Sequence, residues 1–507
     1  MIHSRIDSGT LRDRLDASYY TPEVLENEAQ LRSRGATALR TLIDTDASNY
    51  GVLPPSEDYL PSGSGVPLIR GGDLDGGTIR DPEVDAPLSF KNARGTANVG
   101  DVLLLIKGAC IDSPAGVALV SERHAGSVFN GSCYRVKVAP ACDAGYLVAY
   151  CQTRQLLLQK KREIANTGIA YNAEDSVLGY LVPALSLDAQ RYIGDKVRQA
   201  ERLRERARGL RHSVRASFLA AGFVAVPEPV QKVGRVRWQA VGDRLDAIHY
   251  RADLLGNLEK IQHHRTLSLG SRKDFGELGD GDHGNPIYGT GPIYVRATEL
   301  SGGLLDGATD VRLDEAYAAR LPASVWATEE DVMFSIVATL GAVGIVEDGT
   351  RAVMSRGVAK VRPLSLPKHY VKAFMRTPTF GLELLRRSVG TIQRGVYLES
   401  LQGLEIPLLP PRDIELIAKA EADSDACIAA ARRVAAAAKL LVGHLIDARM
   451  AEADLVAAQK ALEAGDRNAD REILKGLRQS DAPDAKPLIA DVDALYALLD
   501  GPEGQDA

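Results

Sequence analysis

The hydrophobic positions of this chain follow two patterns that each occur twice. Short apolar runs, "DVLLLI" at 101–106 and "DVMFSIV" at 331–337, are bounded by Gly or Asp and are typical of buried strands. Stretches with apolar residues every three or four positions follow at 144–165 and 368–389 and predict helices. A Gly-containing loop and an apolar segment that ends at a proline complete each pattern. We therefore predict two globular domains of the α+β class.

The two patterns lie in register along the chain. The stretch "DRLDA" occurs at 13–17 and at 243–247, 230 positions apart, and a tyrosine follows each copy, Tyr20 and Tyr250. A single match of this kind would be weak, but several in the same order favour a tandem duplication over chance. The matches place these residues against one another: Arg70 and Arg296, Asp101 and Asp331, Gly116 and Gly344, and Pro183 and Pro407.

A long helical segment follows each copy. In the first, at 187–220, the apolar stripe consists of Ile193, Val197, Ala200, Leu203, Ala207, Leu210, Val214 and Phe218. In the second, which begins near Asp413, the stripe consists of Ile417, Ala420, Ser424, Cys427, Ala431, Val434, Ala438, Leu441 and Leu445. Alternating steps of three and four residues are typical of a coiled-coil seam. We expect the two helices to pair; the alternative is that each packs on its own domain.

These patterns divide the chain into six parts. The predicted ranges are a first domain at 1–186, a first spacer helix at 187–222, a proline-marked linker at 223–238, a second domain at 239–411, a second spacer helix at 412–463 and a C-terminal tail at 464–507. The tail has no counterpart after the first copy. Two interpretations of it stay open, docking on a partner and loose order.

Composition and charge narrow the class of protein. The chain has 507 residues, a net charge of −6 and a pI near 5.9, so it lacks the global basic character of many nucleic-acid binders, although a local basic face remains compatible with this charge. Its five cysteines show no CxxC spacing and predict free thiols in a reducing compartment. No signal-peptide core and no apolar run of membrane-span length occurs, so we expect a cytoplasmic protein without membrane contact.

No catalytic centre stands out. The run "NPIYGTGPIY" at 285–294 is similar to the Asn-Pro-Pro-Tyr motif of amino methyltransferases, but Ile287 replaces the second proline and no glycine-rich unit for a methyl donor precedes it. A turn before a strand is the favoured interpretation. His249, His263 and His264 lack the HExxH spacing of a zinc site and predict surface histidines. We expect a non-enzymatic chain with no cofactor and no metal.

Positive charge gathers on the first helix. Arginines occur at Arg198, Arg202, Arg204, Arg206, Arg208, Arg211 and Arg215. Intrahelical pairs with Glu201 and Glu205 account for part of this charge. The remainder is suited to a phosphate backbone or to an acidic partner subunit.

Polar side chains gather in loops at corresponding places in the two copies. Side chains of these types read base edges or hold phosphates, although an ordinary polar turn is the alternative for each one. The candidate DNA-binding residues are Arg70, Lys107, Asn130, Ser132, Tyr134, Arg135, Asn166, Thr167, Tyr171 and Asn172 in the first copy, and Arg296, Thr339, Arg356, Lys360, Thr391, Gln393, Arg394 and Tyr397 in the second.

From Leu11 to Leu445 the chain resembles the specificity (S) subunit of type I restriction–modification systems. The phrases that carry the resemblance are "RLDASYYTPE", "PIYGTGPIYV", "VGDVLLLIKGA", "GTIQRGVYLESLQGLEIPLLPP" and "LDAQRYIGDKVRQAERLRE", together with their order and duplication. The resemblance implies two target-recognition domains, each reading half of a bipartite site in double-stranded DNA. It also implies an antiparallel coiled coil that spaces these domains.

The resemblance further implies partners: two DNA methyltransferase (M) subunits and, as an additional component, a translocating restriction (R) subunit. The loops "NTGIAYN" and "GTIQRGVY" differ between the copies, which predicts an asymmetric target. The acidic charge and the tail depart from the family pattern and leave a related phage-defence system with other partners open. Two rival classes also stay open, a tandem protein-binding adaptor and a self-contained DNA methyltransferase or nuclease.

Overall fold

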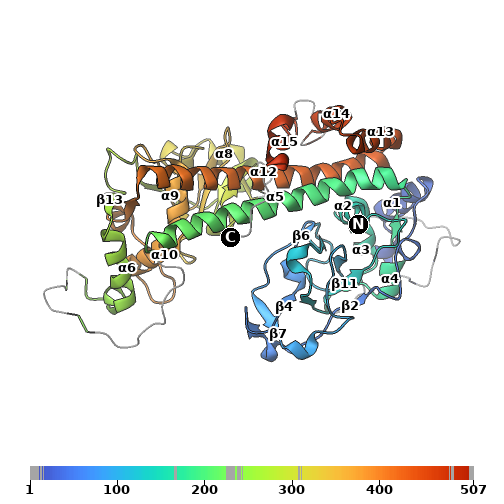
Figure 1. Cartoon of the computed structure of the whole chain (residues 1–507), viewed down its shortest axis with the longest axis horizontal. Coiled ribbons are helices and arrows are strands. Elements are labelled where there is room, and N and C mark those ends of the chain that lie inside the picture. Colours follow the sequence, from blue (N-terminus) through green and yellow to red (C-terminus); the bar gives the residue numbers. More distant parts are fainter. Residues whose placement is uncertain are drawn as a thin grey trace. The chain divides into compact units, whose positions relative to one another are not determined.

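The computed structural model describes residues 11, 14, 16–164, 168–223, 235–236, 241, 244–306, 309, 311–478, 480 and 485–501. These residues form two compact units (Figure 1). Unit 1 comprises the described residues of 1–203 and 430–501, and unit 2 comprises those of 204–429. Each unit therefore contains one copy of the repeat and a part of each long helix. Of the predicted linker at 223–238, all but 223, 235 and 236 lies outside the described residues.

The first copy is built from short strands and four helices within unit 1. Its strands are β1 (Thr37–Ala38), β2 (Asn49–Tyr50), β3 (Leu60–Pro61), β4 (Val66–Ile69), β5 (Leu74–Asp75), β6 (Thr78–Ile79), β7 (Val84–Ala86), β8 (Val102–Leu105), β9 (Val117–Leu119), β10 (Val128–Phe129), β11 (Cys133–Val136) and β12 (Leu181–Val182). Its helices are α1 (Pro22–Ser33), α2 (Ala144–Cys151), α3 (Arg154–Arg162) and α4 (Glu174–Leu178). The sheets β2-β11-β8-β9 and β10-β4-β7-β3 enclose a core that includes Ile69, Leu103 and Phe129.

The second copy has the same plan within unit 2. Its strands are β13 (Arg265–Ser268), β14 (Gly279–Asp280), β15 (Tyr288–Val295), β16 (Leu304–Leu305), β17 (Arg312–Leu313), β18 (Trp326–Ala327), β19 (Val332–Ser335), β20 (Val343–Val346), β21 (Ala352–Met354), β22 (Val358–Val361) and β23 (Glu405–Leu408). Its helices are α6 (Ala252–Gln262), α7 (Ala297–Leu300), α8 (Glu315–Ala318), α9 (Lys368–Met375), α10 (Pro378–Arg387) and α11 (Leu398–Gln402). The two apolar runs predicted as buried strands form β8 and β19, whose residues are all buried.

The duplication is confirmed by matching hydrogen bonds. The Tyr20 hydroxyl donates to the carbonyl of Arg14 at 2.6 Å, and the Tyr250 hydroxyl donates to the carbonyl of Arg244 at 2.7 Å. Each of these arginines also pairs with the aspartate two positions later. In each copy an Arg–Asp pair, Arg14 with Asp16 and Arg244 with Asp246, therefore lies next to the backbone that the following tyrosine holds.

One predicted match is wrong by two positions. In the pair β8–β9, Leu103 lies opposite Ala118, and in the pair β19–β20, Met333 lies opposite Gly344. Because Leu103 and Met333 are the second residues of equivalent strands, Gly344 corresponds to Ala118 and not to Gly116. The connection at 106–116 is longer than the one at 336–342, so the glycines fall at different positions.

The two long helices are α5 (Leu187–Ala220) and α12 (Pro411–Ile446). Their predicted stripes are buried except at Leu210, Ala420 and Leu445, which are half-buried. In unit 2 the helices touch, because the Ser424 hydroxyl donates to the carbonyl of Ala207 at 3.1 Å. Arg206 lies close to Cys427, and Arg211 lies close to Glu421. Residue numbers thus rise along one helix as they fall along the other, so the pair is antiparallel. The small residues Ala207 and Ser424, both fully buried, allow this close approach.

A buried charge cluster attaches the second copy to α12 within unit 2. The Lys372 ammonium, on α9, lies 2.5 Å from an Asp425 oxygen and 3.0 Å from a Glu421 oxygen, and Arg376 donates to Glu421 at 2.9 Å. Burial raises the pKa of the Glu421 carboxyl, but the cations of Lys372 and Arg376 outweigh it and hold that pKa below its ordinary value. Burial raises the pKa of the Asp425 carboxyl despite the neighbouring Lys372 ammonium. The cluster thus joins α9 to α12 through both carboxylates.

The helix predicted at 412–463 is two helices. α12 ends at Ile446, and α13 (Glu452–Glu463) begins after a reversal of the chain. Ala448 adopts a left-handed conformation with φ 58°, as is common just after a helix end, and the amide of Arg449 closes the turn on the carbonyl of His444 at 2.8 Å. The apolar stripe stops at the same place, so the sequence pattern and the helix end coincide.

The tail is ordered where the structure describes it. α13, α14 (Asn468–Gly476) and α15 (Val492–Asp500) share buried apolar residues that include Leu455, Leu474 and Leu495. The Asp470 carboxylate, 1% exposed, accepts hydrogen bonds at 2.6 Å from the hydroxyls of Tyr192 and Tyr496 and from the ammonium of Lys196. Because Tyr192 and Lys196 belong to α5, this carboxylate fastens the tail to the first spacer helix.

The five cysteines are free thiols, as predicted, and burial raises the pKa of Cys133, Cys142 and Cys151 to about 12. Among the described residues, no helix combines the length and the apolar character that crossing a membrane requires.

Replacement of Asp470 tests the attachment of the tail. We expect Asp470→Ala to lower the free energy of unfolding of unit 1 by about 3–5 kcal/mol, because it leaves the Lys196 ammonium buried without a partner. The matched control is Asp493→Ala, which removes an exposed ion pair with Arg471 and should cost less than about 1 kcal/mol. Urea denaturation followed by circular dichroism measures both. Equal losses in the two variants would contradict the assigned role of Asp470.

Candidate nucleic-acid interface

In unit 2, four segments meet beyond the ends of β15, β19 and β21. The amide of Ile336 donates to the carbonyl of Gly357 at 2.8 Å, and the amide of Val396 donates to the carbonyl of Ile336 at 2.9 Å. The amide of Ala338 donates to the carbonyl of Arg394, and that of Ser355 donates to the carbonyl of Val295, both at 2.9 Å. Main-chain hydrogen bonds thus bring 295–296, 336–339, 355–357 and 390–397 into one loop cluster.

Unit 1 contains the same loop cluster. The amide of Ile106 donates to the carbonyl of Ser132, and that of Asn172 donates to the carbonyl of Ile106, both at 2.9 Å. The amide of Gly108 donates to the carbonyl of Ala170 at 3.0 Å, and that of Asn130 donates to the carbonyl of Ile69 at 2.9 Å. Each of these four bonds has its counterpart in unit 2, so the two copies hold their loops on the same backbone frame.

The side chains on this shared frame differ. Lys107 occupies the position of Val337, and Gly131 occupies the position of Arg356. Tyr171 occupies the position of Gly395, as the order of the hydrogen bonds requires. Two clusters with one backbone geometry and different side chains present different chemistry to a ligand.

Part of the predicted set faces solvent. Tyr171 is 39% exposed and Tyr397 is 70% exposed. The other exposed members are Lys107, Arg296, Thr339, Arg356, Thr391 and Gln393. Asn166 and Thr167 lie outside the described residues. In unit 2 the exposed members carry guanidinium groups, hydroxyls, an amide and an aromatic ring, which are groups that contact phosphates and base edges.

Four predicted residues are buried and have partners inside the protein. The Tyr134 hydroxyl donates to Glu174 at 2.7 Å, and the Asn172 side chain binds the Lys160 carbonyl and the Tyr180 hydroxyl. Arg135 donates to the carbonyl of Thr96 at 2.8 Å and lies 3.9 Å from Asp101; its counterpart Lys360 lies 4.0 Å from Asp331. Burial lowers the pKa of Lys360. These side chains support the frame from inside.

Arg70 and Arg296 have equivalent structural partners. The Arg70 guanidinium lies 3.4 Å from both Asp73 and Glu83, and that of Arg296 lies 2.7 Å from Glu299. Each arginine stands at the start of a helical turn, and its main-chain amide donates to the carboxylate of the acidic residue three positions later, at 2.7 Å for Arg70 and 2.9 Å for Arg296. Both guanidinium groups therefore keep a carboxylate partner next to the loop cluster.

The remaining predicted residues shape the loops. The Asn130 side-chain oxygen accepts from the amide of Ser132 at 3.2 Å, and both residues are half-buried. Arg394 donates to the hydroxyl of Ser388 at 3.3 Å.

Sequence reasoning missed two exposed apolar or aromatic side chains in unit 2. Ile392, at the tip of the loop between the bridged residues Val389 and Gly395, is 100% exposed. Tyr288 is 57% exposed and lies edge-on to Tyr294, with 6.1 Å between ring centroids. For Ile392, the sequence signal was an isoleucine inside the otherwise polar loop "GTIQRG". Tyr288 lies in the run "NPIYGTGPIY", where the predicted turn leads into β15.

The arginines of α5 are partly engaged with acidic side chains. Arg198 pairs with Asp143 at 3.0 Å, and Arg211 lies 3.9 Å from Asp425. Arg208 pairs with Glu205, as the intrahelical interpretation predicts. Much of this charge therefore serves contacts within each unit. Over the part of the chain that the structure describes, no group of His, Cys, Asp and Glu has the arrangement of a metal site.

Comparison with solved structures finds chains of similar length at low sequence identity. The chain is similar to solved structures of type I restriction–modification S subunits. One, from M. genitalium, is 12% identical, covers 81% of this chain and 94% of its own, and has a TM-score of 0.39. The HsdS subunit of Thermoanaerobacter tengcongensis is 18% identical over 84% and 95% of the two chains, with a TM-score of 0.25. A chain of a type I restriction–modification assembly is 15% identical over 84% and 96%, with a TM-score of 0.27.

No protein-family model matches the sequence, and comparison with curated proteins returns no relative.

The backbone at Ala338 offers a test of the loop frame. Ala338 has φ 63°, a left-handed conformation that a side chain disfavours, whereas the equivalent Gly108 also has positive φ but no side chain. We expect Ala338→Gly to leave stability unchanged or raise it by up to about 1 kcal/mol, and Ala338→Val to lower it by about 2 kcal/mol. Thermal unfolding measures both. A valine variant as stable as the glycine variant would contradict the left-handed backbone.

Proposed function

We propose that this chain is the DNA sequence-specificity subunit of a type I-like restriction–modification system or of a related phage-defence system. Each copy is a target-recognition domain that reads one half of a bipartite, asymmetric site in double-stranded DNA. The observation that carries this proposal is the pair of loop clusters with one backbone frame and different exposed side chains. The protein itself supplies no catalytic residue.

The reading residues are the exposed members of the two loop clusters. Lys107 and Tyr171 read in the first copy, and Arg296, Thr339, Arg356, Thr391, Gln393 and Tyr397 read in the second. Tyr134, Arg135, Asn172 and Lys360 are positioning residues in this proposal, because they are buried beneath the loops. α5 has 34 residues and is therefore about 50 Å long, more than the one turn of about 34 Å that separates half-sites on one face of DNA.

The partners follow from this role. Two methyltransferase (M) subunits supply the chemistry that this chain lacks, and a translocating restriction (R) subunit joins them in the nuclease form. Arg198, Arg208 and Arg211 of α5 bind acidic side chains within their own units. In this proposal the partner subunits dock on other parts of the α5 surface. Linking two readers in one chain also raises affinity through effective concentration.

The target itself is measurable. We expect methylated bases in the host genome to fall in one bipartite, non-palindromic sequence, and deletion of the gene for this chain to remove that methylation. Long-read sequencing of modified bases measures both. A single palindromic core, or methylation that persists in the deletion strain, would overturn the proposal.

Replacing Arg356 tests the reading loops. We expect Arg356→Ala to weaken specific DNA binding by the chain with its partner by about 1–3 kcal/mol, which is about 5- to 150-fold, and to relax base preference in one half-site only. The matched control is Arg351→Ala, at the other end of β21, where the guanidinium lies over the Trp326 ring at 4.5 Å. Competition binding with randomised half-sites separates the two variants. Equal losses in both, or loss in both half-sites, would contradict the assigned surface.

A tandem protein-binding adaptor is the second candidate, favoured by the net charge of −6 and by the fully exposed Ile392. Salt-dependent binding of duplex DNA by the chain and its partner distinguishes the two candidates, because only contacts with phosphates release counterions.

A further inference from the structure

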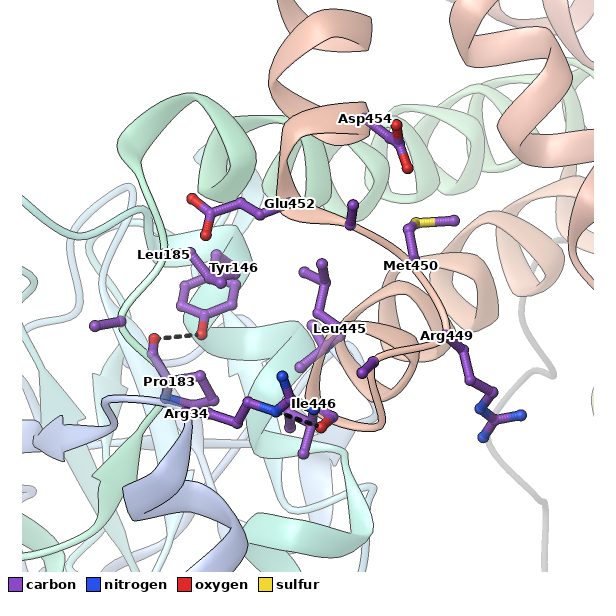
Figure 2. A pocket seen from close by; sticks show the side chains of 14 residues that line it. Arg34, Tyr146, Pro183, Leu185, Leu445, Ile446, Arg449, Met450, Glu452 and Asp454 are labelled. Carbon is purple, nitrogen blue, oxygen red and sulfur yellow. Dashed lines mark hydrogen bonds between the residues drawn. The ribbon is translucent and has the colours of Figure 1, made fainter.

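Unit 1 contains a pocket where α12 ends and α13 begins (Figure 2). Its volume is about 480 Å³, and its apolar wall includes Pro183, Leu185, Val442 and Leu445. Tyr146 forms its floor, with its hydroxyl donating to the carbonyl of Pro183 at 2.8 Å. Dry apolar cavities of about 150 Å³ already bind benzene, so this pocket has room for an aromatic ring.

The duplication supplies the equivalent place in unit 2. There the Tyr370 hydroxyl donates to the carbonyl of Pro407 at 2.7 Å, as Tyr146 does to Pro183. His264 follows α6 as Arg34 follows α1, and each contacts a carbonyl at the end of a long helix: His264 that of Ala221 at 3.1 Å, and Arg34 that of Ile446 at 3.1 Å. The walls of the two places therefore correspond.

In unit 2 this place is filled by two phenylalanines. The Phe218 ring lies 6.0 Å from the Tyr370 ring, and the Phe223 ring stacks on the His264 ring at 5.0 Å. Both are buried, with exposures of 2% and 4%. In unit 1 the end of α12 offers the smaller Val442 and the polar Arg449 instead, and the pocket occupies the space.

The charges around the pocket indicate which kind of ligand would fit it. The Arg34 guanidinium is held at the pocket by its hydrogen bond to the carbonyl of Ile446. A guanidinium in this place attracts the face of an aromatic ring. The α13 side of the rim is acidic, with Glu452 and the exposed Asp454. An aromatic ring followed by a positive charge would complement both features.

We propose that this pocket binds an aromatic side chain of another polypeptide, with a basic residue next to it. The bound ring packs on Leu185 and Leu445, the half-buried members of the apolar wall, and stacks against Arg34, as Phe223 does against His264 in unit 2. The basic neighbour lies against Glu452 and Asp454. This inference does not depend on the proposed DNA-reading role.

Small probes test the pocket on the full-length chain. We expect phenethylamine, a benzene ring with an ammonium, to bind at least fivefold more tightly than cyclohexylethylamine, which keeps the charge and loses the aromatic face, or 3-phenylpropionate, which reverses the charge. The peptide acetyl-Phe-Lys-amide should bind at least as tightly as phenethylamine. Isothermal titration calorimetry measures all four. Equal binding of the three small probes would overturn the proposal, and so would binding of phenethylamine without binding of the peptide.

Variants locate the binding. Val442→Phe should fill the pocket, abolish probe binding and leave the melting temperature unchanged or higher. Arg34→Ala should weaken phenethylamine binding at least threefold, and Arg34→His should restore most of it, since histidine performs this role in unit 2. The matched control is Arg32→Ala, on the same helix, which removes only an exposed pair with Glu28. Undiminished binding by both Val442→Phe and Arg34→Ala would overturn the proposal.

Discussion

The contact between α5 and α12 is the constraint on which both units depend. Unit 1 is not a continuous stretch of chain, because it needs 430–501 as well as the first copy, whereas unit 2 (204–429) contains its copy and a part of each helix that flanks it. In unit 2 the closest approach uses Ala207 and Ser424, where larger side chains would hold the helices apart. Unit 1 is assembled from two distant segments, so its core is complete only after the long loop that contains the second copy has closed.

Buried polar contacts fix different segments to the long helices in the two units. In unit 2, Lys372 reaches two carboxylates of α12. In unit 1, Asp470 of the tail receives Lys196 and Tyr192 of α5. Both sites bury a lysine ammonium next to a carboxylate. Such a pair adds little net stability, but removal of one partner is costly, because it leaves the other charge buried alone. The chemistry of the two contacts is alike, but the segments differ, α9 with α12 in unit 2 and the tail with α5 in unit 1, so the tail is an integral part of unit 1.

Much of this architecture could be predicted from sequence because it depends on local periodicity. The buried strands β8 and β19, the apolar stripes of α5 and α12 and the duplication all leave a repeating signal in the chain. The break after Ile446 left little signal, since Ala448 is an ordinary helix former that here adopts positive φ. The candidate site was harder to predict, because the sequence does not show whether a polar side chain in a loop faces solvent or the protein interior. Arg135 and Lys360 look like ligand-binding residues in sequence, yet each turns inward to an aspartate that only the fold brings near.

The loop clusters are held by main-chain amides and carbonyls, and this has a consequence for how such a protein changes over time. A mutation on the exposed side of a loop leaves the bonds that shape the loop intact, so folding and recognition are largely uncoupled at these positions. Selection is then able to rewrite the surface of one copy without refitting its interior or disturbing the other copy. The specificity of each copy can therefore change by single substitutions on its exposed loop surface, independently of the other copy.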